Sequence, residues 1–97
     1  MAFILSADAE AKIRYSKSEK LLFECLAKAQ QPVTTLELVA GIYRQRRPIN
    51  ARQSVLTIAK SLMMKVDKNK EAFRILRSEQ IGPRPISFWI EPKKAKQ

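Results

Sequence analysis

Two helix-start signals, one soon after the other, constrain this chain most. In a capping box, a Ser or Thr side chain covers a free backbone amide of the first helical turn, and a Glu three positions later reaches back to the amide of the cap. Ser16 and Glu19 have this spacing, and Thr34 and Glu37 repeat it. The sequence therefore predicts two short helices in succession, the first of which ends before Pro32.

A third helix is predicted over residues 51–66. Pro48 excludes helix at the residue before it, and Asn50 is a favourable N-cap. Helical spacing gives a buried stripe of Val55, Ile58, Ala59, Leu62 and Val66. It leaves the opposite face to Gln53, Thr57, Lys60, Ser61 and Met64. A face so poor in acids is suited to lie against phosphates.

After residue 70 the apolar period changes from that of a helix to that of a strand. Phe73 and Ile75 alternate with other residues in one run, and Phe88 and Ile90 do so in a second. The connection 79–85 contains two prolines and is expected to protrude as a stiff loop. A short strand at 12–15 is expected to add an edge. The predicted fold is α+β and mainly α, with three helices and a β-hairpin.

The length of 97 residues suits one compact domain. We expect an N-terminal arm at 1–12, the domain at 13–92 and a basic disordered tail at 93–97. The net charge is +10, and it is uneven: residues 1–30 carry five basic and four acidic side chains, 31–66 carry six and one, and 67–97 carry eight and four. A polyanion is therefore the expected partner, and the last two thirds should supply the surface that binds it.

Several functional classes are disfavoured. The chain has no histidine and a single cysteine, Cys25, which removes the usual zinc sites and the common His-dependent catalytic arrangements. We expect Cys25 in the core, no metal or other cofactor, and no enzymatic activity. There is no apolar run near the ~20 residues of a membrane span, so a cytoplasmic protein is expected.

Three helices followed by a hairpin form the pattern of a winged helix-turn-helix, and the residues from 13 to 90 resemble the output domain of OmpR/PhoB-type response regulators. The segment 15–19 parallels the family's opening Leu-Thr-x-x-Glu, and 32–38 parallels its Val-Ser-Arg-Glu-x-Leu. The spacing of its third helix is kept by Val55, Ala59, Leu62, Lys65 and Val66. The resemblance implies a winged-helix domain that binds double-stranded DNA.

The sequence departs from that family at the positions that matter for base recognition. Leu56, Ile58 and Ser61 stand where the family has aspartate, histidine and arginine, and 81–85 replaces its glycine-rich wing. No sequence preference can be inferred from the resemblance.

The predicted DNA contacts fall in three places. The third helix would enter the major groove with Arg52, Gln53, Thr57, Lys60 and Met64. The turn before it would hold phosphates with Arg44, Arg46 and Arg47. Arg84, between two prolines in the wing loop, would enter the minor groove. Trp89, on a strand beside Phe88, is expected in the core.

Three functions remain open at this stage. The favoured one is a small bacterial or phage transcription regulator, associated with the nucleoid, that prefers a DNA sequence. The alternatives are a non-specific architectural DNA binder and a winged-helix adaptor that holds another protein. Besides double-stranded DNA, the candidate partners are RNA polymerase and another regulator. The adaptor hypothesis depends on exposure of Leu56, Met63 and Met64.

Overall fold

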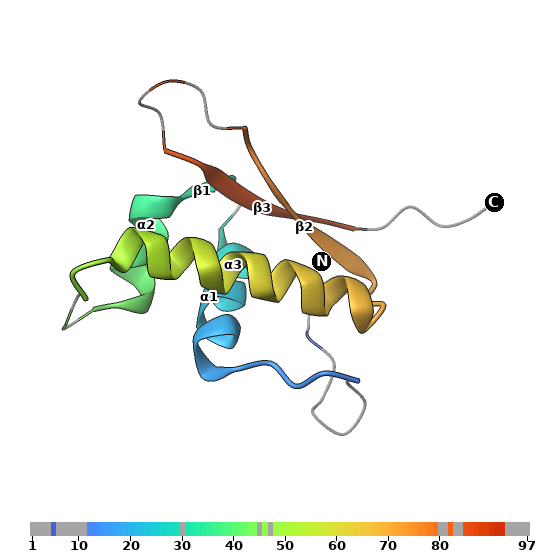
Figure 1. Cartoon of the computed structure of the whole chain (residues 1–97). Coiled ribbons are helices and arrows are strands. Elements are labelled where there is room, and N and C mark those ends of the chain that lie inside the picture. The colour runs from blue at the N-terminus through green and yellow to red at the C-terminus, as the bar shows by residue number, and fades with distance from the viewer. Residues whose placement is uncertain are drawn as a thin grey trace.

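The computed structural model describes residues 5, 12–29, 31–44, 46, 48–79, 82 and 85–92. In this part of the chain, helices pack against one side of a small antiparallel sheet (Figure 1). The elements in chain order are α1 (Lys17–Lys28), β1 (Val33–Thr34), α2 (Thr35–Ile42), α3 (Ala51–Lys68), β2 (Phe73–Arg77) and β3 (Ser87–Pro92). The prediction of an α+β fold that is mainly helical is confirmed. The predicted tail 93–97 lies outside the described residues, as does most of the arm 1–12.

Both capping boxes form as predicted. The Ser16 hydroxyl accepts the Glu19 amide at 3.1 Å, while the Glu19 carboxylate accepts the Ser16 amide at 2.6 Å. Thr34 and Glu37 repeat this exchange at the start of α2. The prediction for Asn50 is only half right, because α3 starts after it but its side chain makes no capping hydrogen bond. Its backbone, at φ −103° and ψ 45°, lies outside the extended region that N-caps usually adopt.

The sheet has the order β1-β3-β2, so the edge strand beside β3 is β1. The predicted strand at 12–15 does not form. Its place is taken by Val33–Thr34, which the chain brings beside Phe88 on the way into α2. The backbone of Ile13 instead hydrogen-bonds to a side chain, that of Asn69.

The core lies where the helices meet the sheet. Every helix and strand contributes side chains to the core, and the outward-facing positions of the strands lie outside it. The most deeply buried side chains are Leu22, Leu38, Val55, Leu62, Val66 and Phe88. The rings of Phe23 and Phe73 join α1 to β2, with centroids 5.4 Å apart. Burying such side chains is the main favourable term in the free energy of folding.

Two positions are less buried than the sequence predicts. Ile58 and Trp89 are both half-buried. The indole N–H of Trp89 donates to the carboxylate of Glu91 at 3.0 Å, on the exposed side of β3. α3 also continues two residues past the predicted end, to Lys68.

Gly41 shows how closely α1 and α2 approach each other. A Cβ at this position would lie 2.8 Å from the Cys25 sulfur, which is closer than real Cβ contacts allow. The glycine therefore fits the packing of the two helices, although it lowers helix propensity. Cys25 is half-buried against the core, and this burial raises the pKa of its thiol above the ordinary value.

Candidate functional site

The two flanks of α3 face different parts of the molecule. Its core stripe contacts the other elements, and the side chains exposed before its last turn are Arg52, Gln53, Thr57, Lys60 and Met64. These are the residues that the sequence predicts as the binding face of this helix. One flank of α3 adjoins the sheet, and the other adjoins α1 through Ser61 and Lys65.

On the sheet side there is a hollow of about 580 Å³ between α3 and the β2–β3 hairpin. We call it the hairpin hollow. Its described lining is Gln53, Leu56, Thr57, Lys60, Met63, Arg77 and Phe88. The lining therefore combines two cations with an apolar floor, and no carboxylate is among these residues. Within the described part of the chain neither Lys60 nor Arg77 has an ion-pair partner.

Arg77 is the residue of this hollow that the sequence reasoning missed. Side chains alternate along β2, so Arg77 shares the helix-facing side of the strand with Phe73 and Ile75. Those two are buried, but Arg77 stands at the strand end, opposite Phe88, and is exposed beside α3. An arginine in phase with the core positions of a strand was the signal available in the sequence.

Thr57 has a side-chain arrangement that limits what it can offer to a ligand. Its hydroxyl donates to the backbone carbonyl of Gln53 at 3.0 Å, within α3 itself. The hydroxyl proton is thus already used, and the γ-methyl group is the part of this exposed side chain that has no hydrogen-bonding role.

The predicted arginine turn lies apart from the hairpin hollow. Arg44 and Arg46 are exposed, and they line a second hollow of about 570 Å³ with residues of α1 and the end of α2. One of those α1 residues is acidic, Glu24. Arg47 and Arg84 lie outside the described residues.

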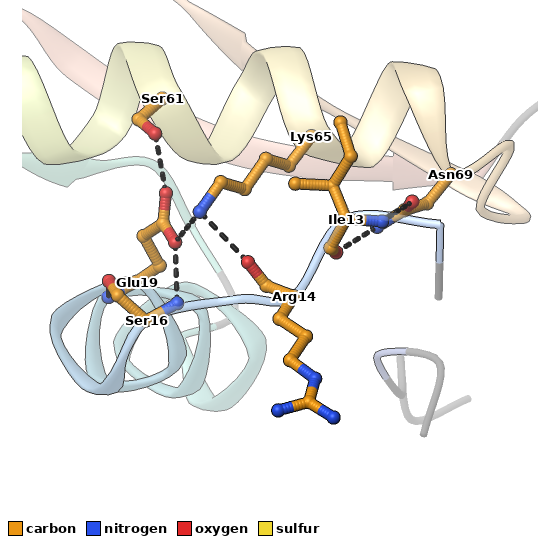
Figure 2. Close-up of polar contacts among 7 residues, drawn as sticks. All are labelled: Ile13, Arg14, Ser16, Glu19, Ser61, Lys65 and Asn69. Atoms are coloured by element: carbon orange, nitrogen blue, oxygen red, sulfur yellow. Dashed lines mark hydrogen bonds and ion pairs between the residues drawn. The ribbon is translucent and has the colours of Figure 1, made fainter. Parts of the chain in front are cut away.

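The other flank of α3 is closed by a polar network centred on Glu19 (Figure 2). This carboxylate is only 3% exposed. Besides the capping bond, it accepts the Ser61 hydroxyl at 2.6 Å and the Lys65 ammonium at 2.7 Å. Lys65 also donates to the backbone carbonyl of Arg14 at 2.9 Å. The Lys65 side chain therefore joins α3 to α1 and to the segment that precedes α1.

The network sets the protonation state of Glu19. Burial opposes ionisation, but the hydrogen bonds from Lys65, Ser16 and Ser61 outweigh it and hold the pKa of the Glu19 carboxyl below its ordinary value. Glu19 is thus a buried carboxylate anion compensated by Lys65. The exposed position predicted for Ser61 is wrong, because this side chain is half-buried and faces Glu19.

Two further contacts fasten the segment before α1 to the end of α3. The Asn69 side chain donates to the Ile13 carbonyl and accepts the Ile13 amide, both at 2.9 Å (Figure 2). The Tyr15 hydroxyl donates to the Glu71 carboxylate at 2.6 Å. Burial, followed by this bond and the charges of Glu71 and Glu19, raises the pKa of Tyr15 to about 12.

The adaptor hypothesis depends on the exposure of three apolar side chains of α3. Leu56 and Met63 are half-buried, and Met64 remains 53% exposed.

In the described residues there is no cluster of potential metal ligands. None of the described helices has both the length and the apolar character of a membrane span.

Comparison with protein-family models, curated proteins and solved structures gives no match to this chain. Its functional assignment therefore rests on its own side chains and their arrangement.

Proposed function

We propose that this protein is a winged-helix DNA-binding protein that acts as a small transcription regulator in the nucleoid. In this proposal α3 lies in the major groove of duplex DNA, and the loop between β2 and β3 reaches the adjacent minor groove. The protein acts by binding and needs no cofactor.

The topology supports this proposal. A helix, a short strand, two helices and a two-stranded hairpin follow one another, with the sheet order β1-β3-β2. This is the element order expected of a winged helix, in which the second helix of the helix-turn-helix pair enters the groove. In this chain that helix is α3, in line with the resemblance to OmpR/PhoB-type output domains.

The observation that carries the proposal is the charge of the hairpin hollow. Lys60 and Arg77 approach it from two different elements, without an ion-pair partner in the described residues and without a carboxylate in its described lining. Two unpaired cations beside an exposed helix face attract a polyanion and are placed to hold phosphates. The first turn of α3 is also free of acids, and the acidic residue of this helix, Asp67, lies in its last turn. The N-terminal two thirds of α3 are therefore the part suited to the groove.

The proposal is tested by binding to duplex DNA. A selection from random duplexes at about 0.15 M salt, followed by titrations over a range of salt concentrations, measures both sequence preference and the number of phosphates contacted. We expect Lys60→Gln and Arg77→Gln to weaken binding and to reduce the salt slope by about one each.

The matched control is Arg74→Gln. Arg74 is exposed on the same strand as Arg77 but alternates to the opposite face of the sheet. The same loss of charge there should leave binding within about twofold of the wild type, since this face does not adjoin α3. Binding that is unaffected at Lys60 and Arg77, or lowered equally by all three changes, would contradict the proposed interface.

A further inference from the structure

The hairpin hollow presents both polar and apolar groups of α3 to a base. In the hairpin hollow the uncharged polar side chains are Gln53 and Thr57. The hydroxyl proton of Thr57 is used within the helix, on the carbonyl of Gln53. Donated hydrogen bonds to base edges can therefore come from Gln53 and the two cations, whereas Thr57 keeps an acceptor oxygen and an exposed methyl group.

Apolar side chains make up the rest of the lining of the hairpin hollow. Leu56 and Met63 are half-buried at the hollow, the deeply buried Phe88 forms part of its lining, and Met64 is exposed on the same helix. Lys60 and Arg77 lie around this apolar patch. The hollow therefore suits a partner that is anionic at its edges and carries an apolar group between them.

Duplex DNA has one apolar group of this kind in its major groove. The C5-methyl group of thymine projects there, whereas the other exposed base edges carry hydrogen-bond donors and acceptors. Phosphates flank the groove on both sides. A thymine methyl with its neighbouring phosphates thus matches the arrangement of the hairpin hollow.

We propose that this protein recognises thymine through its C5-methyl group, with the γ-methyl of Thr57 as the contacting group. This inference rests on the proposed binding of α3 in the major groove and names what that helix detects. Leu56 and Met63 extend the apolar surface around the contact, and Lys60 and Arg77 hold the flanking backbone.

The experiment compares two duplexes that differ only in this methyl group. Pools of random-sequence duplexes are prepared with thymine or with deoxyuracil, and the affinity of the full-length protein is measured for each. We expect the deoxyuracil pool to bind about fourfold more weakly for each methyl contacted, which corresponds to the ~0.8 kcal/mol of one buried methyl group. Replacing cytosine by 5-methylcytosine in the deoxyuracil pool should restore part of the affinity.

Two conservative variants separate the methyl group from the hydroxyl. Thr57→Ser keeps the hydroxyl and removes the methyl, so it should bring the ratio of the two affinities close to one. Thr57→Val keeps a methyl in the same place and should retain the ratio. Because Thr57 is exposed, both variants should fold like the wild type, and thermal melting checks that they do.

The outcomes distinguish this inference from the function on which it rests. Equal affinity for the thymine and deoxyuracil pools would overturn thymine recognition while leaving DNA binding intact. An unchanged ratio in Thr57→Ser would overturn the role of Thr57. Failure to bind either pool at physiological salt would remove the proposed function itself.

Discussion

Lys60 and Lys65 are the same residue type on the same helix, little more than one turn apart, but they lie in opposite surroundings. Lys65 faces α1, where its ammonium group contacts a buried carboxylate and a backbone carbonyl. Lys60 faces the hairpin hollow and has no ion-pair partner in the described part of the chain. One charge is used to hold the fold together, and the other remains available to a ligand.

This difference shows why net charge alone does not locate a binding surface. The residues from 31 to 66 contribute more net positive charge than either end of the chain, but not every cation in them is free. The charge of Lys65 is balanced by a buried anion, whereas the charge of Lys60 adds to the electrostatic field outside the molecule. The two flanks of α3 therefore make separate predictions, one for stability and one for binding.

The largest expected effect comes from Lys65→Met. The change removes the cation but leaves Glu19 buried as a carboxylate, so it should lower the free energy of unfolding by about 3 kcal/mol. This is the low end for a broken buried pair, because the Lys65 side chain is 20% exposed. Lys60→Met should stay within about 0.5 kcal/mol of the wild type. Urea denaturation of both variants at neutral pH measures the contrast.

A double variant separates the buried charge from the packing around it. Glu19→Gln combined with Lys65→Met leaves no ion in the interface, so it should be more stable than Lys65→Met alone. If Lys60→Met and Lys65→Met proved equally destabilising, the two flanks would not differ in the way the structure indicates.

Alkaline pH should lower the stability of the protein by removing the hydrogen bond from Tyr15, in the segment before α1, to Glu71, which follows α3. The pKa of Tyr15 is about 12 in the folded protein and ~10 in the unfolded chain. Because the folded value is the higher one, the contribution is complete below pH ~10 and is lost as the pH rises toward ~12. The loss amounts to roughly 2–3 kcal/mol.

Two variants isolate this tyrosine. In Tyr43→Phe the tyrosinate absorbance reports on Tyr15 alone, because the chain contains only these two tyrosines. In Tyr15→Phe the steep loss of stability in this pH range should be reduced. A Tyr15 titration with an ordinary pKa would mean that its contact with Glu71 does not persist in solution.

The parts of the fold that the sequence predicts correctly are those set by local interactions. Both capping boxes, the helical periods and the hairpin alternation involve residues close in the chain. β1 was missed because two residues are too short for any alternation to be seen, and Val33 is placed by pairing with the distant Phe88. The mistaken strand at 12–15 has the same cause, since the distant Asn69 holds that backbone.

The residues of the candidate site also divide into those that local spacing predicts and those that depend on tertiary packing. Helical spacing brings Gln53, Thr57 and Lys60 to one face, and the structure finds them around one hollow. Spacing within α3 cannot show that Ser61 faces a carboxylate of another helix, because that contact depends on how α1 packs. Arg77 was accessible in principle, since its phase on the strand was visible, but its position beside α3 depends on the tertiary fold.

Acid should reduce the loss of stability caused by Lys65→Met, and with it the contrast between the two flanks of α3. The pKa of Glu19 is lower in the folded protein than in the unfolded chain, so its contribution to stability is complete above the ordinary carboxyl pKa of ~4.3 and is lost as the pH falls through the folded value. In Lys65→Met the carboxyl is buried without its cation and takes up a proton more readily. The gap in unfolding free energy between wild type and Lys65→Met should therefore shrink below pH ~4. A gap that is constant with pH would show that the cost of Lys65→Met is one of packing.

The smallest effect compares two hydroxyl groups on α3. The Ser61 hydroxyl donates to the buried carboxylate of Glu19, while the Thr57 hydroxyl donates to a carbonyl of its own helix in an exposed position. Ser61→Ala removes a hydrogen bond to an ion that water cannot easily replace, so it should lower the free energy of unfolding by about 1–2 kcal/mol. Thr57→Val should change it by less than about 0.5 kcal/mol, since solvent reaches the carbonyl that loses its second donor. Binding should respond to neither change, because Ser61 is on the α1 flank and valine keeps the methyl group of Thr57. Equal stability of the two variants in urea titrations would mean that Lys65 and the Ser16 amide compensate the buried carboxylate without the Ser61 hydroxyl, which would confine the contrast between the flanks to the two lysines.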